Sequence, residues 1–242
     1  MTQNIYDEPV FFQAYSQMAR SINGLDAAPE WPALQAMLPP MQGLKVVDLG
    51  CGYGWFCRWA SEQGAHSVLG LDVSQKMLDR AGSTPSASNI RYERADLEKL
   101  NLPADSFDLA YSSLALHYIK DLAGLFANIH AALKPGSRFV FSIEHPIFTA
   151  PRNPDWLTDG EGRKSWPVDG YQMEGERVTN WLADGVIKQH RTLGTLLNLL
   201  IGAGFSIRHV NEWGPTDAEV AAQPALAEER DRPMMMLVGV QR

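Results

Sequence analysis

The chain has 242 residues, of which 45% are hydrophobic and 20% are charged, so it is long enough for one large domain or a domain with an insertion. Its net charge of −7, its pI near 5.4 and the lack of any Lys/Arg cluster exclude the usual basic footprint of a nucleic-acid or membrane-surface partner. The first residues are polar and acidic, no apolar run approaches the roughly 18 residues of a membrane span, and Cys51 and Cys57 have neither disulfide-framework nor zinc spacing. We therefore expect a reduced, cytoplasmic protein.

Strand-like apolar runs alternate with helix-like segments as far as residue 144. Apolar periodicity and cap signals predict helices over 54–64, over 72–82 with Ser74 as the N-cap, and over 120–136. The predicted strands lie at residues 44–49, 67–71, 89–93, 107–112 and 137–143. This alternation predicts an α/β fold with a mainly parallel sheet, whose ligands bind beyond the carboxyl ends of the strands.

The alternation stops in a segment rich in Pro, Gly, Asp and Trp, which we interpret as an inserted cap. Inside this segment, residues 145–188, two short strands joined at Asp184-Gly185 are predicted to form a hairpin. A helix over 190–203 and two final strands over 205–213 and 233–241 are predicted to follow.

The stretch KVVDLGCGYGW, residues 45–55, raises the question of which ligand needs a backbone without side chains. A predicted strand ends near Asp48, and three glycines follow at alternate positions: Gly50, Gly52 and Gly54. Such a strand-to-helix turn lets a ligand contact the backbone directly. A dinucleotide site needs a third glycine at position 55, which is Trp55, and no Gly-Lys-Ser/Thr of a phosphate loop follows. The expected ligand therefore approaches the backbone without needing a pyrophosphate cradle.

Two further acids follow the next two predicted strands. Asp72 ends the second strand, where a carboxylate can accept hydrogen bonds from both ribose hydroxyls of a nucleoside. Asp96 lies just beyond the third strand, where a carboxylate can accept hydrogen bonds from an adenine amino group. A single Asp is usually a solvated charge, but acids after three successive strands favour a nucleoside ligand.

Taken in order, these motifs resemble the class I S-adenosylmethionine-dependent methyltransferases, in the group often called type 11. The resemblance covers about residues 44–143, through VVDLGCGYG, GLDVS, ADLEKLNLPADSFDLAYSSLALHYI and LKPGSRFVFSIEHP. The rest of the chain resembles an uncharacterised prokaryotic subgroup, through FFQAYSQMARS, EHPIF, WPVDGYQMEGER, KQHRTL and RPMMMLV.

The resemblance implies a fold, a cofactor and a domain organisation. The fold is a Rossmann-like, seven-stranded, mostly parallel sheet with its last strand antiparallel and helices on both faces. The cofactor is S-adenosyl-L-methionine, and its product is S-adenosyl-L-homocysteine. The chain would be a single domain, 1–242, with an N-terminal helical cap (1–43), a cofactor-binding core (44–144), the inserted substrate cap (145–188), and a C-terminal helix and strands (189–242).

The resemblance also implies which residues contact the cofactor. Gly50, Cys51 and Gly52 would lie against the methionine and ribose, with Asp48 supporting the loop. The other implied contacts are Asp72 on the ribose hydroxyls, Val73 and Met77 on the adenine, Asp96 and Leu97 at the adenine edge, and Ser112, Ser113 and Leu114 near the sulfonium.

Two residues of the N-terminal segment complete this set. Tyr15 and Arg20 would close over the cofactor, with Arg20 on its carboxylate. The alternative is that both side chains only pack on, or solvate, an N-terminal helix.

Possible general bases follow the predicted strands. His117 follows the fourth strand, Glu144 and His145 follow the fifth, and His190 begins the helix after the insertion. A neutral imidazole is a natural base near pH 7. Each histidine also has a structural interpretation: a turn cap for His117, a ring held by backbone for His145, and a helix-start charge pair for His190. Their spacing does not indicate a metal site.

Other features bear on the substrate. Trp156, Trp166, Tyr171 and Trp181 in the insertion would form an apolar substrate wall, a small core of the cap, or both. Enzymes of the family that methylate exocyclic base nitrogens have an Asn/Asp-Pro-Pro-Tyr/Phe motif where this chain reads YSSLALHY.

We therefore expect methyl transfer to an O, N or C nucleophile of a small molecule by in-line displacement. The alternative is a protein that binds S-adenosylmethionine or S-adenosylhomocysteine without transfer. A nicotinamide oxidoreductase is disfavoured by Trp55. No nucleic-acid, membrane or metal partner is expected, and both a monomer and a homodimer stay open.

Overall fold

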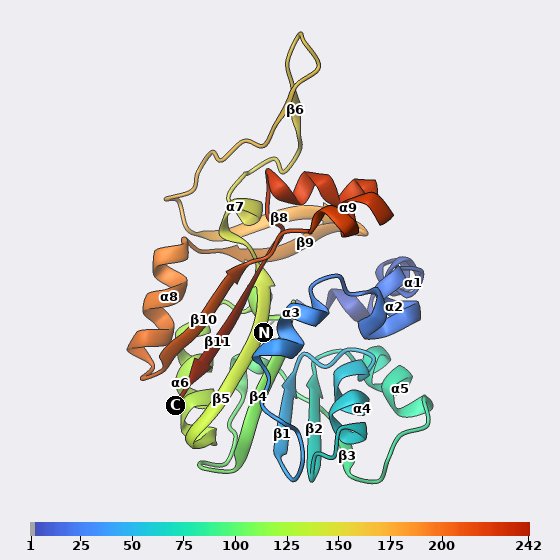
Figure 1. The fold of residues 1–242 in the computed structure, drawn as a ribbon, viewed down its shortest axis with the longest axis vertical. Helices are drawn as coiled ribbons and strands as arrows, with labels where there is room; N and C mark the ends of the chain where they lie inside the picture. Colours follow the sequence, from blue (N-terminus) through green and yellow to red (C-terminus); the bar gives the residue numbers. More distant parts are fainter. Residues whose placement is uncertain (1–2) are drawn as a thin grey trace.

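The computed structural model describes residues 3–242, and its centre is a seven-stranded sheet. The strand order is β10-β11-β5-β4-β1-β2-β3, and only β11 runs antiparallel to its two neighbours (Figure 1). The strands are β1 (Lys45–Leu49), β2 (Ser67–Asp72), β3 (Ile90–Arg94), β4 (Phe107–Ser113), β5 (Leu133–Glu144), β10 (Ser206–Glu212) and β11 (Met235–Gln241). The predicted fold class is confirmed.

Helices cover both faces of this sheet, each over its own apolar core. The helices on one face are α6 (Leu122–Ala132) and α8 (Leu193–Gly202), and those on the other are α3 (Trp31–Met37), α4 (Trp55–Glu62) and α5 (Gln75–Ser83). Because both faces are covered, a central strand such as β1 is apolar on both sides: Val47 packs in one core and Val46 in the other. As predicted, Ser74 caps α5 by accepting the backbone N–H of Met77.

The remaining elements lie around the carboxyl ends of the strands (Figure 1). The N-terminal segment has η1 (Ile5–Asp7), α1 (Pro9–Ser16), α2 (Ala19–Asn23) and η2 (Gly24–Ala27). Short helices η3 (Leu97–Lys99) and η4 (Leu116–Tyr118) follow β3 and β4. The cap contains α7 (Pro146–Thr149), the pair β6 (Leu157–Thr158) and β7 (Lys164–Ser165), and the hairpin β8 (Gly175–Trp181) and β9 (Ala183–His190).

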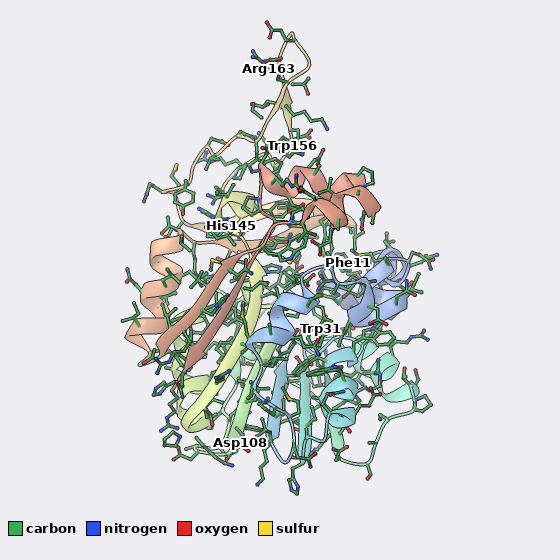
Figure 2. All side chains as sticks on the ribbon, viewed as in Figure 1. Phe11, Trp31, Asp108, His145, Trp156 and Arg163 are labelled. Atoms are coloured by element: carbon green, nitrogen blue, oxygen red, sulfur yellow. The ribbon has the colours of Figure 1, made fainter. Side chains whose placement is uncertain are left out.

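A segment for which the sequence patterns predicted no helix or strand also packs against the cap. Helices α9 (Asp217–Ala222) and η5 (Pro224–Arg230) lie between β10 and β11 and join the cap, where Glu228 accepts a hydrogen bond from the Trp156 indole at 3.0 Å. Arg232 lies over the rings of Trp156 and Trp166, which gives the cap a core of its own. Figure 2 shows Trp156 and Arg163 on the projecting side of the cap and Asp108 at the opposite end of the sheet.

Three boundaries differ from the predictions. Strand β5 begins at Leu133, so its N-terminal part replaces the predicted end of the preceding helix. The β8–β9 hairpin reverses at Leu182, a residue with φ of 59°, and not at Asp184-Gly185, which lies inside β9. Helix α8 begins after its N-cap Thr192, so His190 is the last residue of a strand and does not start a helix.

Candidate functional site

A cavity of about 440 Å³ lies at the carboxyl ends of the central strands. Its walls come from the loop after β1, the ends of β2 and β4, the N-terminal segment and the cap. A volume of this size is in the range of small-molecule sites, which hold roughly 300–1,000 Å³. In a doubly wound sheet this edge is the expected ligand position.

The glycine loop after β1 has a backbone that side chains would strain. Gly50, Gly52 and Gly54 have φ of 78°, 52° and 71°, in the left-handed region. A Cβ on Gly50 would lie 2.4 Å from the Cβ of Ala115, so there is no space for a side chain there. A Cβ on Gly52 would meet no atom within 4 Å. Gly52 lines the cavity, so this open side lets a ligand approach its backbone.

Trp55 ends the glycine series because its ring packs under the N-terminal segment. A Cβ on Gly24 would lie 2.4 Å from the Trp55 ring, so the two residues are in close contact. Trp55 is also the first residue of α4, and both residues line the cavity. A glycine at position 55 would remove this contact between the glycine loop and the N-terminal segment.

Two buried carboxylates hold the loop and line the cavity. Asp72 accepts the backbone N–H of Gly52 at 2.8 Å and that of Ser74 at 2.9 Å. Asp48 accepts the Cys57 thiol at 3.2 Å. Burial raises the pKa of Asp72 to about 6 and the pKa of Asp48 to about 7. Asp72 thus combines a fixed position with a carboxylate that is ionised at neutral pH.

The N-terminal segment contributes to the cavity wall, and its first residues are attached both to the core and to the cap. Asp7 accepts the Ser74 hydroxyl at 2.6 Å, at the start of α5. Gln3 bonds the cap hairpin twice, donating to the Gly185 carbonyl at 2.8 Å and accepting the Ile187 N–H at 2.9 Å. The segment therefore spans from the core of the sheet to the cap.

Most of the residues predicted from the sequence meet at this cavity. Its lining includes Tyr15, Arg20, Asp48, Gly50, Cys51, Gly52, Asp72, Val73, Met77, Leu97, Ser113, Leu114 and His117. Arg20 pairs with the buried Glu30, with 2.5 Å between Nη2 and Oε1. Leu114 has φ of 51°, a strained conformation for a branched residue, and the carbonyl and hydroxyl of Ser142 both accept its N–H.

The other four predicted residues are not in the lining: Asp96, Ser112, His145 and His190. Asp96 caps η3 by accepting the N–H of Glu98. Ser112 is fully buried and donates its hydroxyl to the Leu49 carbonyl at 2.7 Å, which ties β4 to β1.

His145 and His190 have both ring nitrogens engaged in structural hydrogen bonds. Nδ1 of His145 accepts the Ile147 N–H at 3.0 Å, and its Nε2 lies 2.8 Å from Glu212 Oε1. Nδ1 of His190 lies 2.8 Å from the Thr149 hydroxyl oxygen, and its Nε2 lies 2.9 Å from the Tyr171 carbonyl. These contacts hold both rings, and neither ring lines the cavity. His190 ends β9, so it does not form the helix-start charge pair given as its structural interpretation.

His117 does line the cavity, next to two charged residues. Its Nε2 lies 3.8 Å from Glu144 Oε1, and Lys188 Nζ lies 2.5 Å from the same oxygen. Burial lowers the pKa of His117 to about 4, so its imidazole is neutral at pH 7. Lys188 was not singled out from the sequence, because a lysine in a predicted hairpin strand has the pattern of a solvated charge.

The cap aromatics divide between the two interpretations given for them. Trp181 lines the cavity. Trp156, Trp166 and Tyr171 lie outside its lining. Trp156 and Trp166 pack against each other within the cap, and the Tyr171 hydroxyl accepts the backbone N–H of Leu193 at the start of α8. Among residues 3–242, no helix is long and apolar enough to cross a membrane.

Comparison with known proteins identifies the family. The family model described as "Methyltransferase domain" matches residues 47–141. An uncharacterised protein of Haemophilus influenzae is 33% identical over 217 residues, which are 86% of this chain and 85% of that protein. A trans-aconitate 2-methyltransferase of Deinococcus radiodurans is 36% identical over 128 residues, 50% of this chain and 48% of that enzyme.

The crystal structure of an S-adenosylmethionine-dependent methyltransferase from Mesorhizobium loti is 63% identical, with a TM-score of 0.87. The match covers 90% of this chain and all of that one, so it extends well beyond residues 47–141, which the family model matches. The chain therefore belongs to the S-adenosylmethionine-dependent methyltransferases, with S-adenosylmethionine as its cofactor.

Proposed function

We propose that this methyltransferase moves a methyl group to an oxygen, nitrogen or carbon nucleophile of a small molecule by in-line displacement. The observation that supports it is one continuous cavity, which reaches from the glycine loop and Asp72 to His117, Glu144 and Lys188 beneath the cap. The cofactor end and a polar, titratable end thus belong to one cavity.

The residues present fit the cofactor at the first of these ends. No protein atom lies within 4 Å of the position that a Cβ on Gly52 would occupy, so the methionine and ribose of the cofactor have room to contact the Gly52 backbone. Asp72 is held by two N–H donors, and we assign it to the ribose hydroxyls. Val73, Met77 and Leu97 supply apolar surface for the adenine. Arg20 and Tyr15 would close on the methionine end, and Asp96 would act from beyond the lining.

For this reaction the protein mainly has to position the acceptor and exclude water from the site. The cofactor supplies a methyl group on a sulfonium, which is already a good leaving group. Holding the acceptor in line with the carbon–sulfur bond supplies about 7–11 kcal/mol of the barrier reduction. Removing a proton from the acceptor contributes about 10²- to 10⁴-fold. Of the three histidines predicted as bases, we assign this role to His117, because its neutral ring lines the cavity and the rings of His145 and His190 do not.

The small-molecule class is supported by shape and charge. The site is a cavity lined by the N-terminal segment and the cap as well as the core, and the chain has a net charge of −7, which disfavours a nucleic-acid substrate. The Deinococcus enzyme acts on trans-aconitate, but this chain spans about half of its length, so that substrate is not assigned here.

The proposal is tested by a transfer assay on a metabolite mixture. The protein is incubated with S-adenosylmethionine carrying a deuterated methyl group and a small-metabolite extract, and labelled products are sought by mass spectrometry. A product that is absent with Asp72→Ala establishes transfer and names the acceptor. Binding of S-adenosylhomocysteine without any labelled product would instead support a binding protein without transfer.

A further inference from the structure

Three side chains from separate segments meet at the cap end of the cavity. His117 comes from η4, Glu144 ends β5, and Lys188 lies in β9 of the cap hairpin. Their side chains are 3%, 11% and 5% exposed. Glu144 Oε1 is shared, at 2.5 Å from Lys188 Nζ and 3.8 Å from His117 Nε2. The cluster therefore connects the sheet to the cap at the cavity wall.

Some hydrogen-bond donors and acceptors of this cluster have no partner among residues 3–242. Glu144 Oε2 and His117 Nδ1 are buried without a hydrogen-bond partner in this described part of the chain. Lys188 has three N–H donors, of which one bonds Glu144 there. Buried polar atoms are nearly always paired, so unused capacity at a cavity wall marks the position of a ligand group.

The surroundings of the cluster are aromatic. Lys188 Nζ lies 5.2 Å from the Trp181 ring centroid and 5.7 Å from that of Phe148. The ring of Tyr118 lies 4.3 Å from that of His117. These rings, with Pro151 and Met234, line the same cavity. A flat, apolar ligand body with one polar group matches this wall.

The charges at this end do not suit an ionised acceptor. Glu144 and Lys188 neutralise one another, so a carboxylate placed on Lys188 would also face the Glu144 charge. Arg177, the other lining cation of the cap, is bound elsewhere, since it donates to the backbone carbonyls of Ala150, Gly170, Met173 and Glu176. A carboxylate also has no proton for His117 to remove, and an ammonium group has no lone pair with which to attack the methyl carbon.

We propose, on the basis of the function proposed above, that the methyl acceptor is an uncharged phenolic or enolic hydroxyl on a planar apolar molecule, held by His117, Glu144 and Lys188. His117 takes the hydroxyl proton. The oxygen forms the new bond to the methyl carbon, while the carbon–sulfur bond breaks and its electron pair stays on sulfur. The positive charge that leaves sulfur ends on the imidazolium beside Glu144, and Lys188 donates to the oxygen as negative charge develops there.

Binding of matched probes tests the class of acceptor. Naphthol, naphthoate and naphthylamine are titrated by calorimetry into protein saturated with S-adenosylhomocysteine. Naphthol is expected to bind tightest. Glu144→Gln and Lys188→Met should each weaken naphthol about 10- to 100-fold, the usual effect of losing a buried hydrogen bond to a charged group. Glu144→Gln should strengthen naphthoate, because it removes the repelling charge.

The matched control is Asp108→Asn, which removes the carboxylate of a lysine pair far from the cavity. Asp108 lies 2.6 Å from Lys134 Nζ, at the end of the sheet away from the cap (Figure 2). It should leave naphthol binding unchanged. If Glu144→Gln or Lys188→Met fails to fold, the double variant Glu144→Gln/Lys188→Met removes both charges together and should show the same loss. Tighter naphthoate or naphthylamine, or no binding by any probe, would overturn the proposal.

The transfer assay separates this inference from the proposed function. A labelled ether that survives mild alkali supports the hydroxyl class, and His117→Asn should then slow transfer about 10²- to 10⁴-fold. Label released as methanol identifies a carboxylate acceptor, and a labelled amine or carbon product identifies another class; each of these overturns the inference while the proposed function stands. Tight naphthol binding with no labelled product would contradict the proposed function, while the inference that this site binds an uncharged aromatic hydroxyl would stand.

Discussion

Asp7 and Ser74 join the N-terminal segment to the core at the start of α5. Asp7 Oδ1 accepts the Ser74 hydroxyl at 2.6 Å and the Lys76 N–H at 3.1 Å, so one carboxylate caps the first turn of α5 from outside the helix. Ser74 itself follows Asp72 by two residues and donates its N–H to that carboxylate. Ser74 thus links the N-terminal segment to Asp72, the residue predicted to bind the ribose hydroxyls.

Removing this link should loosen the cover over the cofactor. Asp7→Ala is expected to speed dissociation of S-adenosylhomocysteine and to destabilise the protein by about 0.5–2 kcal/mol, the usual effect of losing a helix cap. Stopped-flow dissociation and denaturant unfolding measure the two effects. Asp79→Ala is the control, because Asp79 lies in α5 itself and, among the described residues, accepts a hydrogen bond from the exposed Gln75 side chain without contacting the N-terminal segment. Equal dissociation rates in wild type and Asp7→Ala would show that the segment does not control exit.

Asp72 should dominate cofactor affinity. Asp72→Ala is expected to abolish measurable binding of S-adenosylhomocysteine while the fold stays intact, because the ribose hydroxyls lose their acceptor and Gly52 loses the partner of its N–H. Calorimetry and circular dichroism check the two parts. Asp72→Asn keeps the shape and should retain weak binding. An affinity equal to that of the wild type would disprove the site assignment.

The raised pKa of Asp72 predicts opposite pH effects on binding and on folding. Burial raises this pKa to about 6, so affinity for S-adenosylhomocysteine should fall by up to about tenfold per pH unit below pH 6 as the carboxylate becomes protonated. The pKa of Asp72 in the folded protein thus lies above the ordinary Asp value of 3.8, which applies to the unfolded chain. The contribution of Asp72 to the stability of the free protein is therefore full below about pH 4 and lost as the pH rises through 6.

This folding effect amounts to roughly 3 kcal/mol between pH 4 and pH 7. It is measured as the difference in unfolding free energy between wild type and Asp72→Asn across that range. The comparison cancels His117, whose lowered pKa acts in the opposite direction by costing stability as the pH falls from 6.5 toward 4. A difference that is constant with pH would contradict the raised pKa.

Gly52→Ala should lose cofactor while keeping the fold. A Cβ there meets no protein atom within 4 Å, but it enters the space assigned to the methionine and ribose. Gly43→Ala is a close control, since Gly43 has φ of 77°, also has no atom within 4 Å of its Cβ, and lies outside the cavity lining. Both variants should be destabilised by about 1 kcal/mol through backbone strain. Only Gly52→Ala should weaken S-adenosylhomocysteine binding in calorimetry.

The parts that the sequence predicted well depend on local pattern. The glycines at alternate positions, Asp72 at a strand end and Ser74 at a helix start each follow from a spacing of a few residues, and the structure brings them to one edge of the sheet. The reversal at Leu182 was missed because a leucine with positive φ has no turn signature, whereas Asp184-Gly185 has a strong one.

Other misses depend on contacts across long separations. Lys188 is buried because Glu144, 44 residues earlier, receives it, and the pattern of β9 alone contains no trace of that partner. His145 and His190 satisfy their rings with Glu212 and Thr149, which lie far from them in sequence. Helix α9 is different, because the capping box formed by Thr216 and Glu219 is a local sequence pattern that indicates the start of a helix.

The two attachments of the N-terminal segment have a kinetic consequence. Gln3 bonds the cap hairpin and Asp7 bonds α5, so residues 3–7 tie the cap to the core beside the cavity. Movement of these residues away from the cavity would break both attachments. The two products should then leave during a single opening event, and steady-state turnover should report the rate of that opening when methyl transfer itself is fast.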